Sequence, residues 1–158
     1  MKNTDTTPVT GFELERYLGT WYEIARYPHS FEKGLTGVTA TYSMKENGKV
    51  EVLNAGFKDS LDGTYKTARG KAKFAGDPST GHLKVSFFLF FYADYFIMDL
   101  DMENYNWALI GSSSPKYLWI LCRDSHMDEE LYQQLCHKAV EKGYDLAPLN
   151  KVPQPTDL

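Results

Sequence analysis

The residues best suited to chemistry in this chain are histidines and cysteines, and their spacing decides what they could bind. They are His29, His82, His126, His137, Cys122 and Cys136. Structural zinc sites draw their Cys and His ligands from closely spaced pairs such as Cys-x-x-Cys. No such pair occurs in the sequence. We therefore expect no metal and no cofactor.

Two further features could suggest catalysis. Glu23 is an acid with no second carboxylate or histidine at a useful spacing, and Ser112-Ser113-Ser114 stands directly before Pro115, as is typical of a turn. An enzyme needs a coherent set of acid, base and nucleophile. The sequence contains no such set, so we expect a protein that is not an enzyme.

The composition excludes several other classes of protein. The chain has 158 residues, 42% of them hydrophobic, and a net charge of −4, which suits one folded domain and not a basic nucleic-acid binder. Its most apolar stretch includes FFLFFYADYF at residues 87–96 but is interrupted by Asp94 and Asp99. A membrane-spanning helix needs about 20 mostly apolar residues. The first twelve residues carry no apolar stretch, so we expect no signal peptide in this chain.

Eight short β-type segments separated by turn residues must position any site. We expect strands at residues 21–27, 38–44, 50–57, 64–74, 83–92, 95–100, 105–111 and 117–123. Asn47-Gly48 and Asp62-Gly63 are typical turn pairs between them. Links this short favour an antiparallel meander, because a parallel crossover needs a dozen or more residues.

One amphipathic helix follows the last predicted strand. Acidic residues at 128–130 suit a helix start, and Gly143 suits a helix end. The apolar stripe between them is Tyr132, Leu135, Cys136, Ala139 and Val140. We therefore predict an all-β fold, an eight-stranded antiparallel up-and-down barrel with one C-terminal helix outside it. Residues 12–150 would form the domain, with a flexible segment at 1–11 and a peripheral tail at 151–158.

A barrel of eight strands either fills its interior with side chains or holds one small ligand. Alternation along the strands turns one set of side chains inward. The inward set that we expect to line a ligand cavity is Val38, Ala40, Tyr42, Val52, Asn54, Val85, Phe87, Tyr95, Ile97, Trp119 and Leu121. Trp119 fits a cavity wall and a plain core equally well. Tyr42 and Tyr95 would either orient a polar head group or satisfy their hydroxyls locally.

Three motifs resemble those of the lipocalin family, in order and over roughly residues 12–150. Gly19-Thr20-Trp21-Tyr22-Glu23 is similar to the first motif, and Leu118-Trp119-Ile120-Leu121-Cys122-Arg123 to the third. Asp101 to Tyr105 is similar to the turn of the second motif, with one extra residue. The resemblance implies structural roles for Gly19, Trp21, Asp101, Tyr105 and Arg123. In particular, it implies that Arg123 packs across Trp21 and plugs the closed end of the barrel.

Within this family, the segments GTWYEIARYPHSFEKGL, VTATYS, KVSFF and YLWIL are most similar to the bacterial outer-membrane lipocalins, which also resemble apolipoprotein D. That similarity implies binding, storage or transport of a fatty acid or lysophospholipid at the bacterial cell envelope. It also implies a lipoprotein on the periplasmic face of the outer membrane, held there by a lipidated N-terminal cysteine. No cysteine precedes position 122, so the anchor is either removed from this chain or absent from the natural protein. A lipocalin-fold enzyme, and a filled barrel acting through its surface or as a homodimer, are the alternatives.

Links in a meander alternate between the two barrel ends. The links around 29–37, 58–63, 93–94 and 112–116 therefore share one end, where the family has its open mouth. We expect the rim to include Phe31, Leu35, Phe90, Phe91 and Phe96. The aromatic run at 87–96 would then be a ligand mouth, a membrane-touching lip or a dimer patch, and we favour the mouth. Cys122 and Cys136 stay either as two buried thiols or as a disulfide; we favour the thiols, because nothing fixes their geometry.

Overall fold

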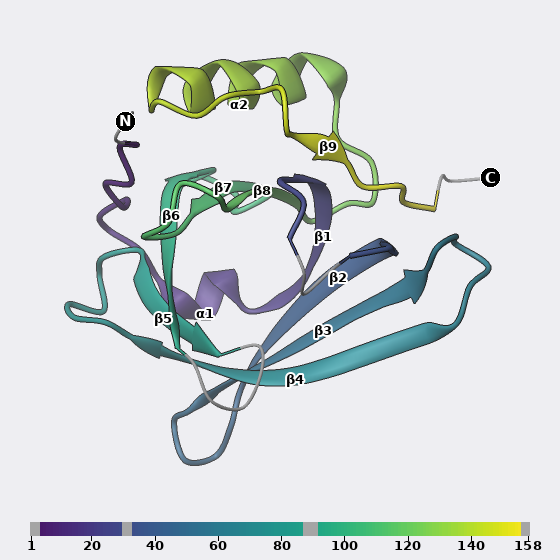
Figure 1. Cartoon of the computed structure of the whole chain (residues 1–158). Helices are drawn as coiled ribbons and strands as arrows, with labels where there is room; N and C mark the ends of the chain where they lie inside the picture. The colour runs from purple at the N-terminus through teal and green to yellow at the C-terminus, as the bar shows by residue number, and fades with distance from the viewer. Residues whose placement is uncertain (1–3, 30–32, 87–91, 156–158) are drawn as a thin grey trace.

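Eight antiparallel strands close into a barrel in the computed structural model, which describes residues 4–29, 33–86 and 92–155 (Figure 1). The strands are β1 Gly19–Arg26, β2 Leu35–Met44, β3 Val50–Lys58, β4 Tyr65–Phe74, β5 His82–Ser86, β6 Ala93–Leu100, β7 Trp107–Gly111 and β8 Leu118–Cys122. Each strand pairs with the next along the chain, and β1 pairs with both β2 and β8, which closes the sheet. The predicted eight-stranded meander is confirmed.

One predicted link is wrong. Ala93 and Asp94 belong to strand β6, where they pair with Val85 and Lys84 of β5. The Ala-Asp pair interrupts the aromatic run in sequence, but backbone pairing continues through it because both residues tolerate an extended conformation. The predicted strand at 83–92 ends at Ser86 in the described part of the chain. Phe31, Phe87, Phe90 and Phe91 lie outside the described residues.

The closing helix packs on one outer side of the barrel. Helix α2, Glu129–Glu141, lies over strands β1 and β6–β8, and a second core fills the space between (Figure 1). Leu118, Ile120 and Cys122 face this core, as the alternation of β8 predicts. Val140 does not join it: its side chain is 48% exposed, so the apolar stripe is narrower than predicted. No helix in the described ranges is long and apolar enough to cross a membrane.

Two buried cysteines lie in this second core. Cys122 comes from β8 and Cys136 from α2, and both are free thiols. Burial raises the pKa of both thiols above its ordinary value. A raised pKa keeps a thiol protonated and unreactive near neutral pH. These residues therefore act as small apolar packing groups.

The segment after α2 is part of the barrel wall. Strand β9, Asn150–Lys151, pairs with Ala25 and Arg26 of β1, beyond the point where β2 has separated from β1. Val152 is buried, and its N–H donates to Ile24 O at 2.9 Å. Residues 150–154 are therefore attached to the barrel wall, because the free edge of β1 offers backbone groups that need partners.

The chain before β1 closes the end of the barrel that lies opposite to β9. Helix α1, Leu14–Tyr17, crosses that end, and Phe12, Leu14 and Tyr17 are buried in the inner core. Upstream, the N–H of Val9 donates to Ile97 O at 2.9 Å, and Gly81 N donates to Val9 O at 2.8 Å. The segment expected to be flexible is thus hydrogen-bonded to the barrel at Val9.

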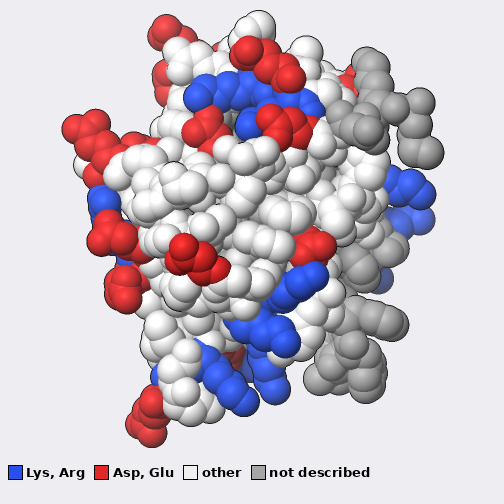
Figure 2. Space-filling view, turned by 90° about the vertical axis from the view of Figure 1, so that its left-hand side faces the viewer, with Lys and Arg blue, Asp and Glu red and all other residues white. Residues whose placement is uncertain are grey.

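Charged side chains are interspersed on the face at the left of Figure 1. Lys and Arg gather near α2 and again toward the lower end, while Asp and Glu lie among them, along the left edge and at single places in the mostly uncharged middle (Figure 2). Two ion pairs anchor α2 to its neighbours: Lys138 pairs with Asp99 at 2.5 Å, and Glu129 pairs with Lys151 at 3.0 Å. The charge around this helix is therefore partly neutralised locally.

Candidate ligand cavity

The closed end of the barrel is sealed by a cation–π pair. The guanidinium carbon of Arg123 lies 3.9 Å from the centre of the fully buried Trp21 ring. The guanidinium nitrogens of Arg123 donate to Tyr105 O at 3.1 Å, Thr20 O at 3.2 Å and Arg16 O at 2.8 Å. Gly19 has φ +103°, and a Cβ there would lie 3.2 Å from Arg123 Nη1, so a side chain would crowd the plug. Gly19, Trp21 and Arg123 thus meet at one place.

The turn between β6 and β7 joins this plug. Tyr105 N donates to Asp101 O at 2.7 Å, a five-residue turn that accommodates the extra residue of the motif. The Asp101 carboxylate accepts N–H bonds from Asn104 and Asn106, both at 3.2 Å. Tyr105 has a left-handed φ of +52°, and its hydroxyl accepts from Glu13 N at 3.0 Å. Asp101 and Tyr105 therefore fix the chain that covers the barrel end.

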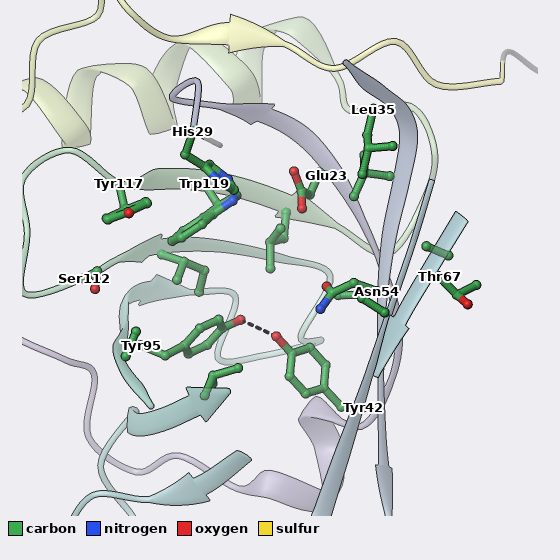
Figure 3. Close-up of a pocket in the computed structure, with 18 of the residues that line it drawn as sticks. Glu23, His29, Leu35, Tyr42, Asn54, Thr67, Tyr95, Ser112, Tyr117 and Trp119 are labelled. Atoms are coloured by element: carbon green, nitrogen blue, oxygen red, sulfur yellow. Dashed lines mark hydrogen bonds between the residues drawn. The ribbon is translucent and has the colours of Figure 1, made fainter. Parts of the chain in front are cut away.

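The opposite half of the barrel interior is hollow. It holds a cavity of about 450 Å³, and at its mouth the lining includes Lys33, Lys58, Ala93 and Ser112. The walls come from facing strands, and the bottom from tyrosines (Figure 3). Cavities that hold small ligands measure about 300–1,000 Å³. The volume suits one small molecule.

Most of the inward set predicted from alternation lines this cavity. The lining includes Val38, Ala40, Tyr42, Asn54, Val85, Tyr95, Trp119 and Leu121. Val52 and Ile97 do not: both are fully buried in the inner core. They point inward, but Ile97 lies one layer deeper than Tyr95, where packed side chains already fill the barrel. Sequence alternation gives direction but not depth.

Two buried tyrosines, Tyr42 and Tyr95, form the floor of the cavity, and the buried Tyr17 packs against Tyr42. The Tyr42 hydroxyl donates to Tyr95 at 3.1 Å, and the hydroxyls of Tyr95 and Tyr17 are 2.5 Å apart (Figure 3). Trp21 Nε1 donates to Tyr17 O at 2.9 Å, which ties the floor to the plug. Burial raises the pKa of Tyr17 and of Tyr95 well above the ordinary value, so both stay neutral. Of the two roles weighed for Tyr42 and Tyr95, the structure shows local satisfaction of their hydroxyls.

The mouth carries a basic character that the sequence reading missed. Lys33, Lys58 and Lys66 line the opening and form no ion pair with any described residue. Alternation does place Lys58 and Lys66 inward, on the faces of Asn54 and Ala68. That inward parity was the signal available in the sequence.

The two acids near the cavity are already neutralised. Glu23 is only 4% exposed and pairs with Arg26 at 3.3 Å. Asp94 pairs with Lys84 at 2.6 Å and with His82 at 2.9 Å. These hydrogen bonds, that of Lys84 foremost, hold the pKa of Asp94 below its ordinary value. Among the described residues that line the cavity, Lys33, Lys58 and Lys66 therefore carry the charge that no ion pair offsets.

Aromatic rings line the upper wall. Trp119 stacks on Tyr117 with centroids 5.7 Å apart, and His29 meets Trp119 edge-on at 5.4 Å (Figure 3). Leu35 lines the mouth as expected. Phe96 does not belong to the rim: it stacks on His82 at 4.4 Å and packs against the core beneath α2. Its neighbours Tyr95 and Ile97 face inward, so alternation turns Phe96 outward.

The serine hydroxyl in the described lining is hydrogen-bonded to the backbone. Ser112 lines the cavity, but its hydroxyl donates to Asp94 O at 2.7 Å, and no base is hydrogen-bonded to it in the described part of the chain. Across residues 4–29, 33–86 and 92–155, no three His, Cys, Asp or Glu side chains cluster closely enough to hold a metal ion. The arrangement suits binding: apolar walls, a hydroxyl-lined floor and a cationic opening.

Comparisons with known proteins agree with this geometry. A family model described as a lipocalin-like domain matches residues 12–154. Outer membrane lipoprotein Blc of Citrobacter freundii is 47% identical over 149 residues, 94% of this chain and 83% of that protein. Apolipoprotein D of Mus musculus is 36% identical over 151 residues, 90% of this chain and 77% of that protein. Insecticyanin of the tobacco hornworm Manduca sexta has the same fold, with a TM-score of 0.74 at 18% identity over 96% of this chain and 85% of that one. The chain belongs to the lipocalin family, and bacterial Blc is a nearer relative of it than apolipoprotein D is.

Proposed function

We propose that this protein binds and stores or transports a small hydrophobic ligand, a fatty acid or a lysophospholipid, in the barrel cavity at the bacterial cell envelope. One observation carries the proposal: an apolar cavity with a closed floor opens through three lysines that form no ion pair with described residues. An amphiphile with one acyl chain and an anionic head fits that arrangement from end to end.

The expected binding energies favour weak selectivity for the length of the acyl chain and electrostatic recognition of the anionic head group. Each buried CH₂ contributes about 0.8 kcal/mol, so the walls select chain length only gradually. A lysine about 4 Å from an anion contributes on the order of 1 kcal/mol in a solvated mouth. No chemical step is needed for either contribution.

The proposed location rests on the relatives. The Citrobacter freundii protein is named an outer membrane lipoprotein. We extend this to the present chain, as a lipoprotein on the periplasmic face of the outer membrane. The cavity argues against a filled barrel that acts only through its surface or as a dimer, and the absence of an acid–base–nucleophile set among the described residues argues against an enzyme.

Lipid extraction of the purified protein, followed by mass spectrometry, tests this function. Fluorescence titration with oleate and with oleoyl-lysophosphatidate gives the affinities. A protein that carries no lipid and binds neither probe refutes the proposal.

Charge reversal separates the role of the mouth from general electrostatics. Lys66→Glu puts a negative charge at the opening, and Lys71→Glu makes the same change on the outer face of the same strand. We expect Lys66→Glu to weaken both anionic probes about tenfold, from roughly 1–2 kcal/mol of lost attraction and new repulsion. Monooleoylglycerol, which is neutral, should bind equally to both variants. Equal weakening of the anionic probes by the two variants contradicts the role of the mouth.

A further inference from the structure

One amide interrupts the apolar wall of the cavity. Asn54 stands on β3 between Ala40 of β2 and Ala68 of β4, its register partners, and its side chain points into the cavity (Figure 3). The Nδ2 atom is buried and has no hydrogen-bond partner among the described residues. The hydroxyls of Tyr42 and Ser112 in the same lining do have partners, since Tyr42 donates to Tyr95 and Ser112 donates to Asp94 O.

An unsatisfied amide at this position costs stability. Leaving a buried donor without a partner costs free energy comparable to a lost hydrogen bond, and Asn is among the residues depleted in strands. The neighbours Ala40 and Ala68 are small, which leaves open space in front of the amide. The outer torsion of Asn is broad and roughly two-fold, so the side chain can turn its N–H₂ toward that space.

Asn54 lies deeper in the cavity than the lysines at the mouth. Lys66 pairs with Gly56, two residues from Asn54 along β3 and on the same face. Two residues of a strand span about 6.6–6.8 Å, so Asn54 lies one such layer below Lys66. A Cβ at Gly56 would lie 3.2 Å from Val38 Cγ2, so the side chain of Val38 packs in front of Gly56, at the level of Lys66.

We infer that Asn54 is a specificity-determining residue that donates a hydrogen bond to the acyl carbonyl of a lipid ester whose anionic head lies at the mouth. This inference rests on the proposed function. In a lysophospholipid, six bonds separate the phosphorus from the acyl carbonyl carbon. Three bonds of an extended chain advance 3.3–3.6 Å in a polypeptide, so six span about 7 Å, the depth of one layer. A fatty acid held by its carboxylate at the mouth presents only methylenes to Asn54.

The test compares two ligands that differ in the carbonyl alone. Oleoyl-lysophosphatidate and its oleyl ether analogue share the head and a chain of equal carbon number, but the ether lacks the carbonyl oxygen. We expect the wild-type protein to bind the acyl ligand roughly three- to tenfold more tightly than the ether, the value of one neutral hydrogen bond. A ratio near one in the wild-type protein overturns the inference without any variant.

Two variants test whether Asn54 causes the difference between the acyl and the ether affinity. Asn54→Leu keeps the shape of the side chain and removes the donor, so the ratio of the acyl to the ether affinity should fall to about one while oleate binding holds or improves. Val38→Ala, a control in the next layer, should weaken both lipids equally and keep the ratio. A ratio unchanged by Asn54→Leu refutes the role of Asn54, whereas failure of every lipid to bind refutes the proposed function itself.

Discussion

Removal of the Arg123 side chain should destabilise the barrel without changing what it binds. Arg123→Met keeps much of the apolar stem and deletes the cation–π contact with Trp21 and three hydrogen bonds to backbone carbonyls. A desolvated cation–π contact contributes about 1–2 kcal/mol and each hydrogen bond about 0.5–1.5 kcal/mol net, so the loss should be about 4 kcal/mol. In a domain of this size, that lowers Tm by about 10 °C.

The assay is urea unfolding followed by tryptophan fluorescence, with ligand titration of the folded variants. Arg123→Lys is the graded control, because it keeps the charge over the ring but not the planar fork; we expect about half of the loss. The hydrogen-bonded side chains of Tyr17, Tyr42 and Tyr95 lie between the plug and the cavity, so the ratio of oleate to oleoyl-lysophosphatidate affinity should not change. A loss below about 1 kcal/mol for Arg123→Met would refute the assigned role of the plug, since one hydrogen bond alone is worth that much.

Two further predictions concern the packing of helix α2 and the decrease in stability of the fold at low pH. Leu135→Ala, at a fully buried position beneath α2, should cost about 3 kcal/mol in urea unfolding, whereas Val140→Ala on the exposed side of that helix should stay within about 0.5 kcal/mol; equal effects would contradict the described helix packing. The pKa of Asp94 is lowered mainly by Lys84 and also by His82, so its contribution to stability is present above its unfolded pKa of about 3.9 and is lost as the pH falls through its folded pKa. Asp94→Asn should therefore be less stable than the wild type at pH 7, and the difference should shrink below about pH 4 in unfolding curves; a difference independent of pH would contradict the ion pair.

The alternation of apolar and polar residues correctly predicted which side chains point into the barrel wherever the links between strands were short. On β2 it turned Val38, Ala40 and Tyr42 inward, and on β8 it separated Trp119 from the face beneath the helix. Short links fix the register of neighbouring strands, and a slip of one residue would expose every apolar side chain of a strand. The fold and the inward set therefore follow from local pattern and the family motifs together.

The pattern did not predict how deep an inward side chain lies in the barrel, which inward lysines stay hydrated, or which distant segment pairs with β1. Val52 and Ile97 point inward like the cavity residues, but how far a barrel is filled depends on side chains from all eight strands. Lys58 and Lys66 look like exposed strand ends, although an open mouth lets an inward lysine stay hydrated. The residues that close the wall beside β1 lie beyond α2, and nothing in their own pattern marks them as a strand.

That late closure has a consequence for the order in which the barrel can be completed. Gln154 Nε2 donates to Glu23 O at 2.8 Å, 131 residues earlier in the chain, and to Val38 O at 2.9 Å, and Gly37 N donates to Pro153 O at 2.7 Å. A folding chain in which this last segment has not yet docked has all eight strands but still lacks the residues that join β1 to β2 near the mouth. Contacts this distant in sequence form slowly, because the long intervening loop must close first. We therefore expect the barrel to fold through a stage with a lateral slit beside Glu23.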